Sequence, residues 1–304
     1  MNCFYKIPLI LLLLTISIIS SAQELDTINS IKRKKIYYTG LISSYTASIT
    51  FLYFSWYKSY DKTSFHFFDD SEEWMQMDKA GHFYTSYQLN KAIYNSMLWS
   101  GYNKKTALIL SSIKSFLMMN SIEIFDSFSK KWGFSVSDVF ANTAGIATSF
   151  IEKKYSIDFV SFKFSFHYTN LPNLRSEALG KNKIEQIIKD YNGQTYWISL
   201  NFSDILNYNK LKWINISFGY SAYNMIYART NDQVINNLNI DYSRLLFDKI
   251  PYRRFFVSLD INPKHIKVKN KLIGSILKTF NFIKFPFPTL EINKYTTKFH
   301  IIYF

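Results

Sequence analysis

A histidine and several carboxylates stand at helical spacings in two segments of otherwise apolar sequence. In the first segment, DKAGHF at 78–83, Asp78 and His82 are four residues apart, a spacing that puts two side chains on one face of a helix. The second segment is EIFDSFSKKWGFSVSDVFANTAG at 123–145. Polar groups in apolar surroundings require a partner or a function. The candidate polar cluster is therefore Asp78, Lys79, His82, Glu123, Asp126, Asp138 and Asn142.

Three kinds of chemistry fit these residue types. A metal ion would find one imidazole and several carboxylates, with His82, Glu123 and Asp126 as candidate ligands, but the sequence contains no HExxH motif. General acid and base catalysis on a lipid or glycan would set His82 against a carboxylate, with Lys79 holding a phosphate. We favour the third interpretation, a structural network whose members satisfy one another and fix the helix register. We accordingly assign no catalytic residue and predict no cofactor.

Four helices are needed to position these residues. The first covers the uncharged segment 37–57, which fits a buried bundle helix or a membrane span. The second continues through residue 98, the third covers about 104–128 and the fourth about 136–154. Cap chemistry is available before the second and the fourth helix from Asp69, Asp70, Ser71, Ser135 and Ser137. Short connections predict an antiparallel four-helix bundle over residues 37–155.

After Tyr155 the apolar spacing changes from helical to alternating. Clear alternation, typical of antiparallel strands with one apolar face, occurs at 158–168, 196–202, 214–220 and 255–261. The opposite faces carry Asn201, Asn215, Ser217, Ser258 and Asp260. Weaker strand candidates lie at 240–247, 264–271, 279–285, 287–293 and 297–304, and residues 176–191 predict a short helix. The predicted fold class is α+β, with the helical bundle followed by an antiparallel β region over 156–304.

The strands fit two architectures. One is a sheet packed against the bundle, and the other is a small outer-membrane barrel whose apolar side chains face lipid. The last residues, FHIIYF, resemble the aromatic final strand of outer-membrane proteins. In contrast, Pro286, Pro288 and the basic segment KHIKVKNK fit poorly in a closed lipid-facing wall. We favour a sheet or partial barrel at the membrane, and a closed barrel remains the alternative.

The amino-terminal residues indicate export. Lys6 precedes the apolar run 7–19, and Ser20, Ser21 and Ala22 form a small-residue cleavage site. This pattern is typical of a signal peptide over residues 1–22, followed by an exposed leader at 23–36. Cys3, the only cysteine, precedes the apolar run and so cannot be the acylated residue of a lipoprotein. We expect a mature protein without cysteine, in the periplasm or the outer membrane.

Basic residues are concentrated in the predicted β region. The whole chain has a formal net charge of +14, and residues 157–304 contain 20 basic and 10 acidic residues. An exported protein seldom meets nucleic acid, so the expected partner is membrane lipid or an anionic glycan, with Lys267, Lys269 and Lys271 as candidate lipid contacts. A solvated basic surface is the alternative. No protein partner is indicated.

The polar motifs also resemble a known family. DKAGHF, the Glu123–Asp126 pair and WGFSVSDVFANTAG are similar to the uncharacterised YfiM-like group of predicted periplasmic lipoproteins over roughly residues 65–150. They are more distantly similar to VanZ-like membrane proteins, which share a DK-x-x-H start and a D-x-x-x-N-x-x-G end. The resemblance implies a small helical envelope domain and no reaction. The chain departs from the lipoprotein pattern by lacking a lipobox cysteine, so the strands could replace the acyl anchor as the membrane attachment.

These observations predict a non-enzymatic envelope protein that contributes to outer-membrane organisation or to lipid or glycan contact. The alternative is an enzyme that acts on a lipid-linked or glycan substrate through the His82 cluster. Oligomeric state and substrate are not indicated by the sequence.

Overall fold

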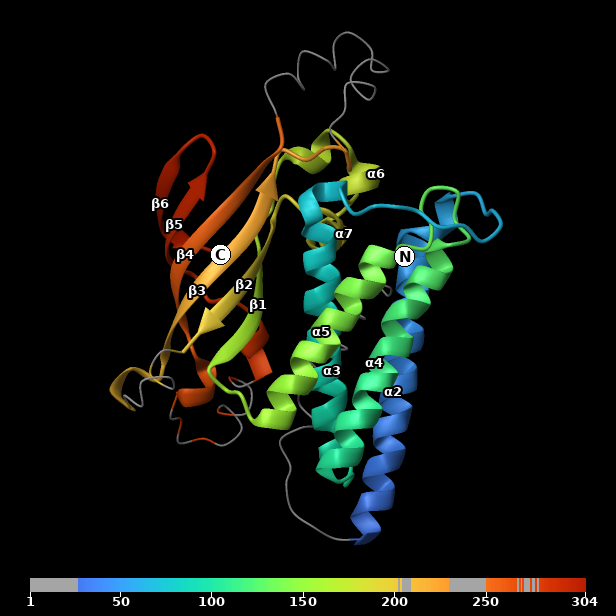
Figure 1. The fold of residues 1–304 in the computed structure, drawn as a ribbon, viewed down its shortest axis with the longest axis vertical. Helices are drawn as coiled ribbons and strands as arrows, with labels where there is room; N and C mark the ends of the chain where they lie inside the picture. The colour runs from blue at the N-terminus through green and yellow to red at the C-terminus, as the bar shows by residue number, and fades with distance from the viewer. Residues whose placement is uncertain are drawn as a thin grey trace. The chain divides into compact units, whose positions relative to one another are not determined.

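The computed structural model describes residues 27–201, 203, 209–229, 250–266, 268, 270, 274, 277 and 279–304. These residues form two compact units (Figure 1). As far as they are described, the helical unit contains the residues up to Asp70, His82–Ile157 and Lys267–Thr279, and the sheet unit contains Ser71–Gly81, Asp158–Ile266 and Phe280–Phe304. The predicted α+β class is confirmed, with four main helices followed by an open antiparallel sheet.

The main helices are α2 (Thr27–Ser55), α3 (Met77–Trp99), α4 (Lys104–Asp126) and α5 (Val136–Tyr155). Local capping explains two of the starts. The Asn103 side chain accepts a hydrogen bond from the Thr106 amide at 2.8 Å, and the Ser135 hydroxyl accepts one from the Asp138 amide at 3.0 Å. Each cap satisfies an amide that the first helical turn leaves without a partner. The predicted Ser135 cap is thus confirmed.

Two helix starts differ from the prediction. Helix α2 begins at Thr27 and so includes residues that the sequence placed in an exposed leader. Lysine and arginine are good helix formers, so the run 32–35 extends the helix instead of preceding it. Helix α3 begins at Met77, so the predicted cap from Asp69, Asp70 or Ser71 is wrong. A turn with left-handed backbone at Trp74, Met75 and Gln76 separates those residues from the helix.

The interior of the helical unit combines an apolar cluster with buried polar groups. The cluster contains Tyr37 of α2, Leu89 and Ile93 of α3 and Met119 of α4. Beside it, Asn90 of α3 accepts hydrogen bonds from Ser111 of α4 and Ser149 of α5, each at 3.3 Å. Large apolar side chains on α4 are instead exposed, among them Ile109, Ile113, Phe116 and Leu117. Helix α4 is the one described helix that is long and apolar enough to cross a membrane.

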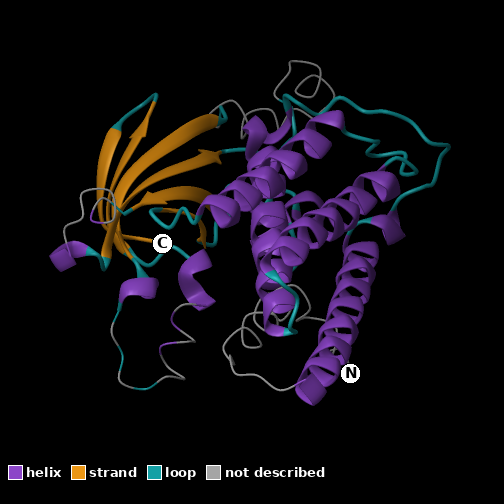
Figure 2. Ribbon diagram, turned by 60° about the horizontal axis from the view of Figure 1, so that its bottom comes forward, coloured by secondary structure: helices purple, strands orange, loops and turns teal. Residues whose placement is uncertain are grey.

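The sheet unit is a six-stranded antiparallel meander (Figure 2). Its strands, paired in chain order, are β1 (Val160–Phe166), β2 (Gln194–Leu200), β3 (Ile214–Tyr223), β4 (Tyr252–Ile261), β5 (Phe287–Asn293) and β6 (Thr297–Tyr303). β1 and β6 are the edges. Part of the β1 edge is covered, because the Lys284 amide donates to the Phe164 carbonyl at 2.9 Å.

Six of the predicted strands correspond to β1–β6, and the other predictions have different outcomes. Residues 280–282 form a 3-10 turn, so the strand predicted at 279–285 is wrong. The strand predicted at 264–271 is also wrong in its first residues, because Pro263–His265 form a 3-10 turn. The short helix predicted at 176–191 is two helices, α6 (Ser176–Leu179) and α7 (Lys183–Lys189), separated by Gly180 with a positive φ. The signal peptide, the strand at 240–247 and the candidates Lys267, Lys269 and Lys271 lie outside the described residues.

The two faces of the sheet have inverted polarity. The inner face is buried but mostly polar, with serine, threonine, asparagine and charged residues at alternate positions of β1–β5. The outer face carries the apolar side chains of the same strands. Tyr196 and Tyr220 of this face pack against Met77, and much of the rest is exposed in the described part of the chain. Phe218, Phe255 and Leu259 there are 46%, 52% and 43% exposed. Water-soluble sheets bury their apolar face, so this arrangement needs an explanation.

Specific pairing makes the polar inner face stable. Lys163 of β1 and Asp260 of β4 are fully buried and form an ion pair at 2.5 Å. Lys163 also donates to the Ile261 carbonyl, and Asp260 accepts from Ser199 of β2. Burial lowers the pKa of Lys163, and Asp260 opposes that shift. Burying either charge without such partners would reduce the stability of the fold by roughly several kcal/mol.

Candidate functional site

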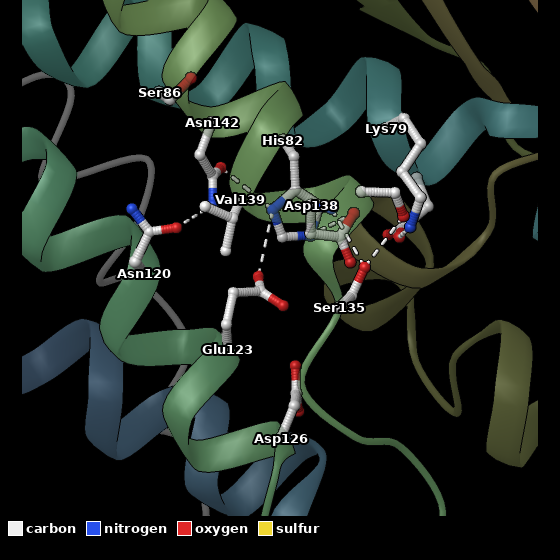
Figure 3. A network of polar contacts seen from close by, with 12 residues as sticks. Lys79, His82, Ser86, Asn120, Glu123, Asp126, Ser135, Asp138, Val139 and Asn142 are labelled. Carbon is white, nitrogen blue, oxygen red and sulfur yellow. Dashed lines mark hydrogen bonds and ion pairs between the residues drawn. The ribbon is translucent and has the colours of Figure 1, made fainter. Parts of the chain in front are cut away.

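His82 lies between two carboxylates in the helical unit (Figure 3). Its Nδ1 atom is 3.6 Å from Glu123 Oε1 of α4, and its Nε2 atom is 3.8 Å from Asp138 Oδ1 of α5. The carboxylates are almost fully buried, whereas the His82 side chain keeps 18% of its surface exposed. The structure therefore brings together three of the residues that the sequence selected, from three different helices.

A chain of amide groups fixes the orientation of the His82 ring. The Asn120 side chain donates to the Phe116 carbonyl at 2.8 Å, which leaves its Oδ1 to accept from Asn142 Nδ2 at 3.3 Å. The Asn142 Oδ1 atom then faces His82 Nδ1 at 3.1 Å. Because a backbone carbonyl can only accept, every donor in the chain is determined, and His82 Nδ1 carries a hydrogen. The remaining ring nitrogen, Nε2, faces Asp138.

Gly145 allows α3 and α5 to approach closely enough for these contacts. A Cβ atom at this position would overlap the Phe83 carbonyl oxygen and the Ser86 hydroxyl of α3. Glycine therefore serves here by its small size.

The start of α5 is held by a second group of hydrogen bonds. Asp70 accepts hydrogen bonds from the hydroxyls of Ser135 and Ser137 at 2.6 and 2.7 Å. Asp70 was predicted to cap α3, but it supports the first turn of α5. That turn contains Asp138, so the Asp70 contacts help to hold the carboxylate that faces His82.

The other members of the predicted cluster have their own partners. Asp78 lies one turn before His82 on α3, forms an ion pair with Lys79 at 3.0 Å and accepts a hydrogen bond from Tyr191 at 2.5 Å. Asp126 accepts a hydrogen bond from the Tyr57 hydroxyl at 2.6 Å. Burial, reinforced by the Asp126 charge, raises the pKa of Tyr57. The geometry thus assigns Asp126 to a contact with the segment after α2.

A further polar group occupies the other end of α5. Glu152 is buried, accepts a short hydrogen bond from Tyr87 and forms ion pairs with Lys91 at 3.1 Å and Lys153 at 3.3 Å. Burial alone would raise the pKa of Glu152, but the two ammonium groups and the tyrosine hydroxyl outweigh it and lower that pKa below its ordinary value. The folded protein therefore favours the charged carboxylate.

This shift makes the stability of the helical unit dependent on pH. The unfolded chain has a Glu152 pKa near 4.5, and the folded protein a lower one. The contribution of Glu152 is therefore complete above the unfolded value and is lost as the pH falls through the folded value. We expect the thermal midpoint to fall on acidification below about pH 4.5, and Glu152→Gln to make this fall smaller. Thermal unfolding between about pH 7 and pH 3 tests this, with Asp61→Asn in an exposed ion pair as the control. An unchanged pH profile for Glu152→Gln would contradict it.

The sequence analysis missed Asn90, Asn120 and Glu152 as members of the buried polar groups. For Glu152 a signal was present in the sequence. Asp138, Asn142, Gly145, Ser149 and Glu152 follow one another at intervals of three and four residues, so they share one face of α5. All of them are buried on that face. Extending the motif two more positions would have included Glu152.

The fold and the site define an α+β protein whose helical unit encloses a cluster of one histidine with carboxylates and amides. Residues 65–154 of this protein match a family described as "Predicted periplasmic lipoprotein (DUF2279)". This match confirms the predicted resemblance to periplasmic lipoproteins over roughly residues 65–150 and supports a location in the cell envelope. The function of that family is unknown. Comparisons with curated proteins and with solved structures gave no match.

Proposed function

We propose that this protein is a non-enzymatic component of the outer membrane, attached through the apolar face of its β-sheet, where it contributes to membrane organisation. The observation that carries the proposal is the inverted polarity of the sheet. Its inner face is filled with paired polar groups, and its outer face is apolar and, among the described residues, largely exposed outside the Tyr196 and Tyr220 contacts with Met77. Lipid-facing sheets have this arrangement because acyl chains, unlike water, are a favourable environment for the apolar side chains.

Strand length supports this proposal. β3 and β4 have 10 residues each and pair along their whole length. Strands that cross a bilayer have about 9–11 residues. Ten residues at about 3.3 Å each extend about 33 Å, which a tilt of about 40° reduces to about 25 Å, the height of the apolar band of outer-membrane strands.

Aromatic residues lie at both ends of these strands. Tyr223 of β3 and Tyr252 of β4 pair at one end, and Tyr295 from the β5–β6 turn contacts the Tyr252 ring with centroids 5.1 Å apart. Trp213, which is 45% exposed, precedes β3 at the opposite end. Tyrosine and tryptophan are enriched at the two interfaces of a bilayer, so their position at both strand ends fits a lipid-facing sheet.

The enzymatic alternative has less support. It requires Lys79 to hold a phosphate, whereas the Lys79 ammonium group is bound to Asp78. It also requires His82 to act on a substrate, whereas Asn142 and Glu123 face its Nδ1 atom and Asp138 faces its Nε2 atom, with 18% of the side chain exposed. The network accounts for these residues as structural elements.

Single-cysteine labelling tests the membrane attachment. The only cysteine of the chain, Cys3, precedes the predicted cleavage site, so an introduced cysteine would be the single thiol of the mature protein. We expect Phe218→Cys and Val257→Cys, on the outer face, to resist a water-soluble maleimide in isolated membranes and to react after solubilisation and denaturation. Asp61→Cys, at a residue whose side chain is 81% exposed in the helical unit, should react in both conditions.

Alkaline extraction of the membranes separates lipid from a protein partner. Carbonate removes peripheral proteins, so protection of Phe218→Cys that survives the extraction indicates lipid contact. Protection that disappears would indicate a covering protein. Recovery of the mature protein in the soluble periplasmic fraction after a high-salt wash would contradict the proposal.

A further inference from the structure

Helix α4 also has inverted polarity, and this feature lies wholly within the helical unit. One series of its residues, spaced by four, is buried: Ala107, Ser111, Ser115, Met119 and Glu123. A second series with the same spacing is 44–63% exposed: Ile109, Ile113 and Leu117. The second series is offset from the first by two positions, or about 200° around the helix, so the two lie on opposite faces. The inward face of α4 thus contains serine and glutamate, and its outward face is aliphatic.

The exposed apolar surface continues into a platform of four phenylalanines, Phe65, Phe67, Phe128 and Phe134. The first two follow α2 in the chain and the last two follow α4, and their ring centroids lie 5.4–6.0 Å apart. Backbone hydrogen bonds join the two segments, because the Phe134 amide donates to the His66 carbonyl at 2.8 Å and the Phe68 amide donates to the Phe134 carbonyl at 3.1 Å. Phe65, Phe67 and Phe128 are nevertheless 46%, 67% and 45% exposed. Exposed apolar surface of this kind marks an interaction site.

Lysines border this surface at both ends of α4. The four are exposed: Lys104, Lys105, Lys130 and Lys131. Lys130 pairs with Asp61 at the surface. The two carboxylates of α4 add little negative charge there, because Glu123 is 1% exposed and Asp126 is bound by the Tyr57 hydroxyl. An apolar surface edged by lysines complements a lipid layer with anionic headgroups, and interfacial amphipathic helices have this composition.

Lys114 indicates that α4 lies along the lipid surface instead of crossing it. The helix is long and apolar enough to cross a membrane, but Lys114 stands near its middle. The Lys114 ammonium donates to the Tyr37 hydroxyl at 2.9 Å and lies 4.9 Å from the ring centroids of Tyr37 and Tyr38. A charge at the centre of the hydrocarbon layer is costly, whereas a helix at the interface keeps the ammonium close to the headgroups.

We propose that the outward face of α4 and the phenylalanine platform lie in the headgroup and upper acyl region of an anionic bilayer, with the four lysines at the headgroups. This is a second lipid contact, made by the helical unit. It goes beyond the attachment through the sheet, and neither proposal depends on the other.

Fluorescence quenching in proteoliposomes tests this surface. The mature protein is reconstituted with phosphatidylethanolamine, phosphatidylglycerol and brominated lipid, and single cysteines carry a bimane probe. We expect bromine to reduce the fluorescence at Leu117→Cys and Phe67→Cys. The loss should be larger with bromine near the glycerol end of the acyl chain than near its methyl end. Thr143→Cys, at an exposed residue of α5, is the matched control and should show no loss.

Replacing lysines tests the role of charge. A lysine near an anionic surface favours binding by roughly fivefold, so Lys130→Gln combined with Lys131→Gln should reduce the quenching at Phe67→Cys. The matched control is Lys181→Gln combined with Lys183→Gln, at two exposed lysines of the sheet unit, and it should leave the quenching unchanged.

A probe at Phe218→Cys separates the two proposals. Quenching there but not at Leu117→Cys and Phe67→Cys would overturn this inference and leave the sheet attachment standing. Quenching at the two helical-unit positions alone would support this inference and contradict the sheet attachment. Stronger quenching of Leu117→Cys by bromine near the methyl end would show that α4 crosses the bilayer, and equal quenching at Thr143→Cys would show that no particular face meets lipid. Either result would overturn the inference.

Discussion

Replacing Gly145 by alanine is expected to destabilise the helical unit by about 3 kcal/mol. The new Cβ atom would overlap the Phe83 carbonyl oxygen and the Ser86 hydroxyl on α3. A backbone carbonyl in a helix cannot rotate away, so α3 and α5 must separate. The separation would also lengthen the distances from His82 on α3 to Asp138 and Asn142 on α5. The free energy of unfolding from denaturant titration in detergent measures the effect.

Gly40→Ala is the matched control for this prediction. Gly40 lies inside α2, and nothing is within 4 Å of the position of its Cβ atom. The same substitution there should stabilise the helix by about 0.5–1 kcal/mol, because alanine loses less conformational entropy than glycine. If both variants change stability in the same direction and by a similar amount, close helix contact is not the reason for glycine at position 145.

Breaking the Lys163–Asp260 ion pair is expected to destabilise the sheet unit by about 3–5 kcal/mol. Both side chains are 0% exposed, so removing one leaves the other charge buried without its main partner. Lys163→Met leaves the Asp260 carboxylate, and Asp260→Leu leaves the Lys163 ammonium. Asp260→Leu should have the larger effect because Lys284 also depends on Asp260. Burial lowers the pKa of Lys284 to about 8, and Asp260 opposes that shift.

A double-mutant cycle separates the ion pair from the rest of the packing. The double variant Lys163→Met with Asp260→Leu should recover much of the lost stability, because no unpaired charge of this pair remains buried. Unfolding in detergent gives the four free energies of the cycle. Asp61→Asn, which breaks the exposed pair between Asp61 and Lys130, should have no measurable effect. Additive effects of the two single substitutions would show that the pair is not coupled.

Local chemistry made much of the fold predictable. The start of α5 could be placed because Ser135 hydrogen-bonds within its own first turn, to the Asp138 amide. The strands could be placed because alternation with period two is a property of a single segment, as in β3 and β4. The helix before Tyr37 was missed because a basic run has no apolar periodicity, although its residues favour the helical backbone.

The candidate site was predictable in composition and only partly in geometry. His82, Asp138 and Asn142 were selected by spacing, and the structure places them in contact. The spacing on α4 could not decide whether Glu123 or Asp126 faces His82, because a rotation of the helix about its axis exchanges the two positions. The structure directs Glu123 to His82 and joins Asp126 to Tyr57.

The sequence by itself determined the order of helices and strands, the alternation of apolar and polar residues and the identity of the polar motifs, because these depend on neighbours within a few turns. Only the tertiary structure decided that the polar face of the sheet is the buried one and that Lys163 meets Asp260, 97 positions later in the chain. Alternation indicates that a strand has two different faces, but it does not indicate which face lies inside. The pairing of buried charges from distant strands determines that choice here, and it leaves the apolar face for the membrane that we propose.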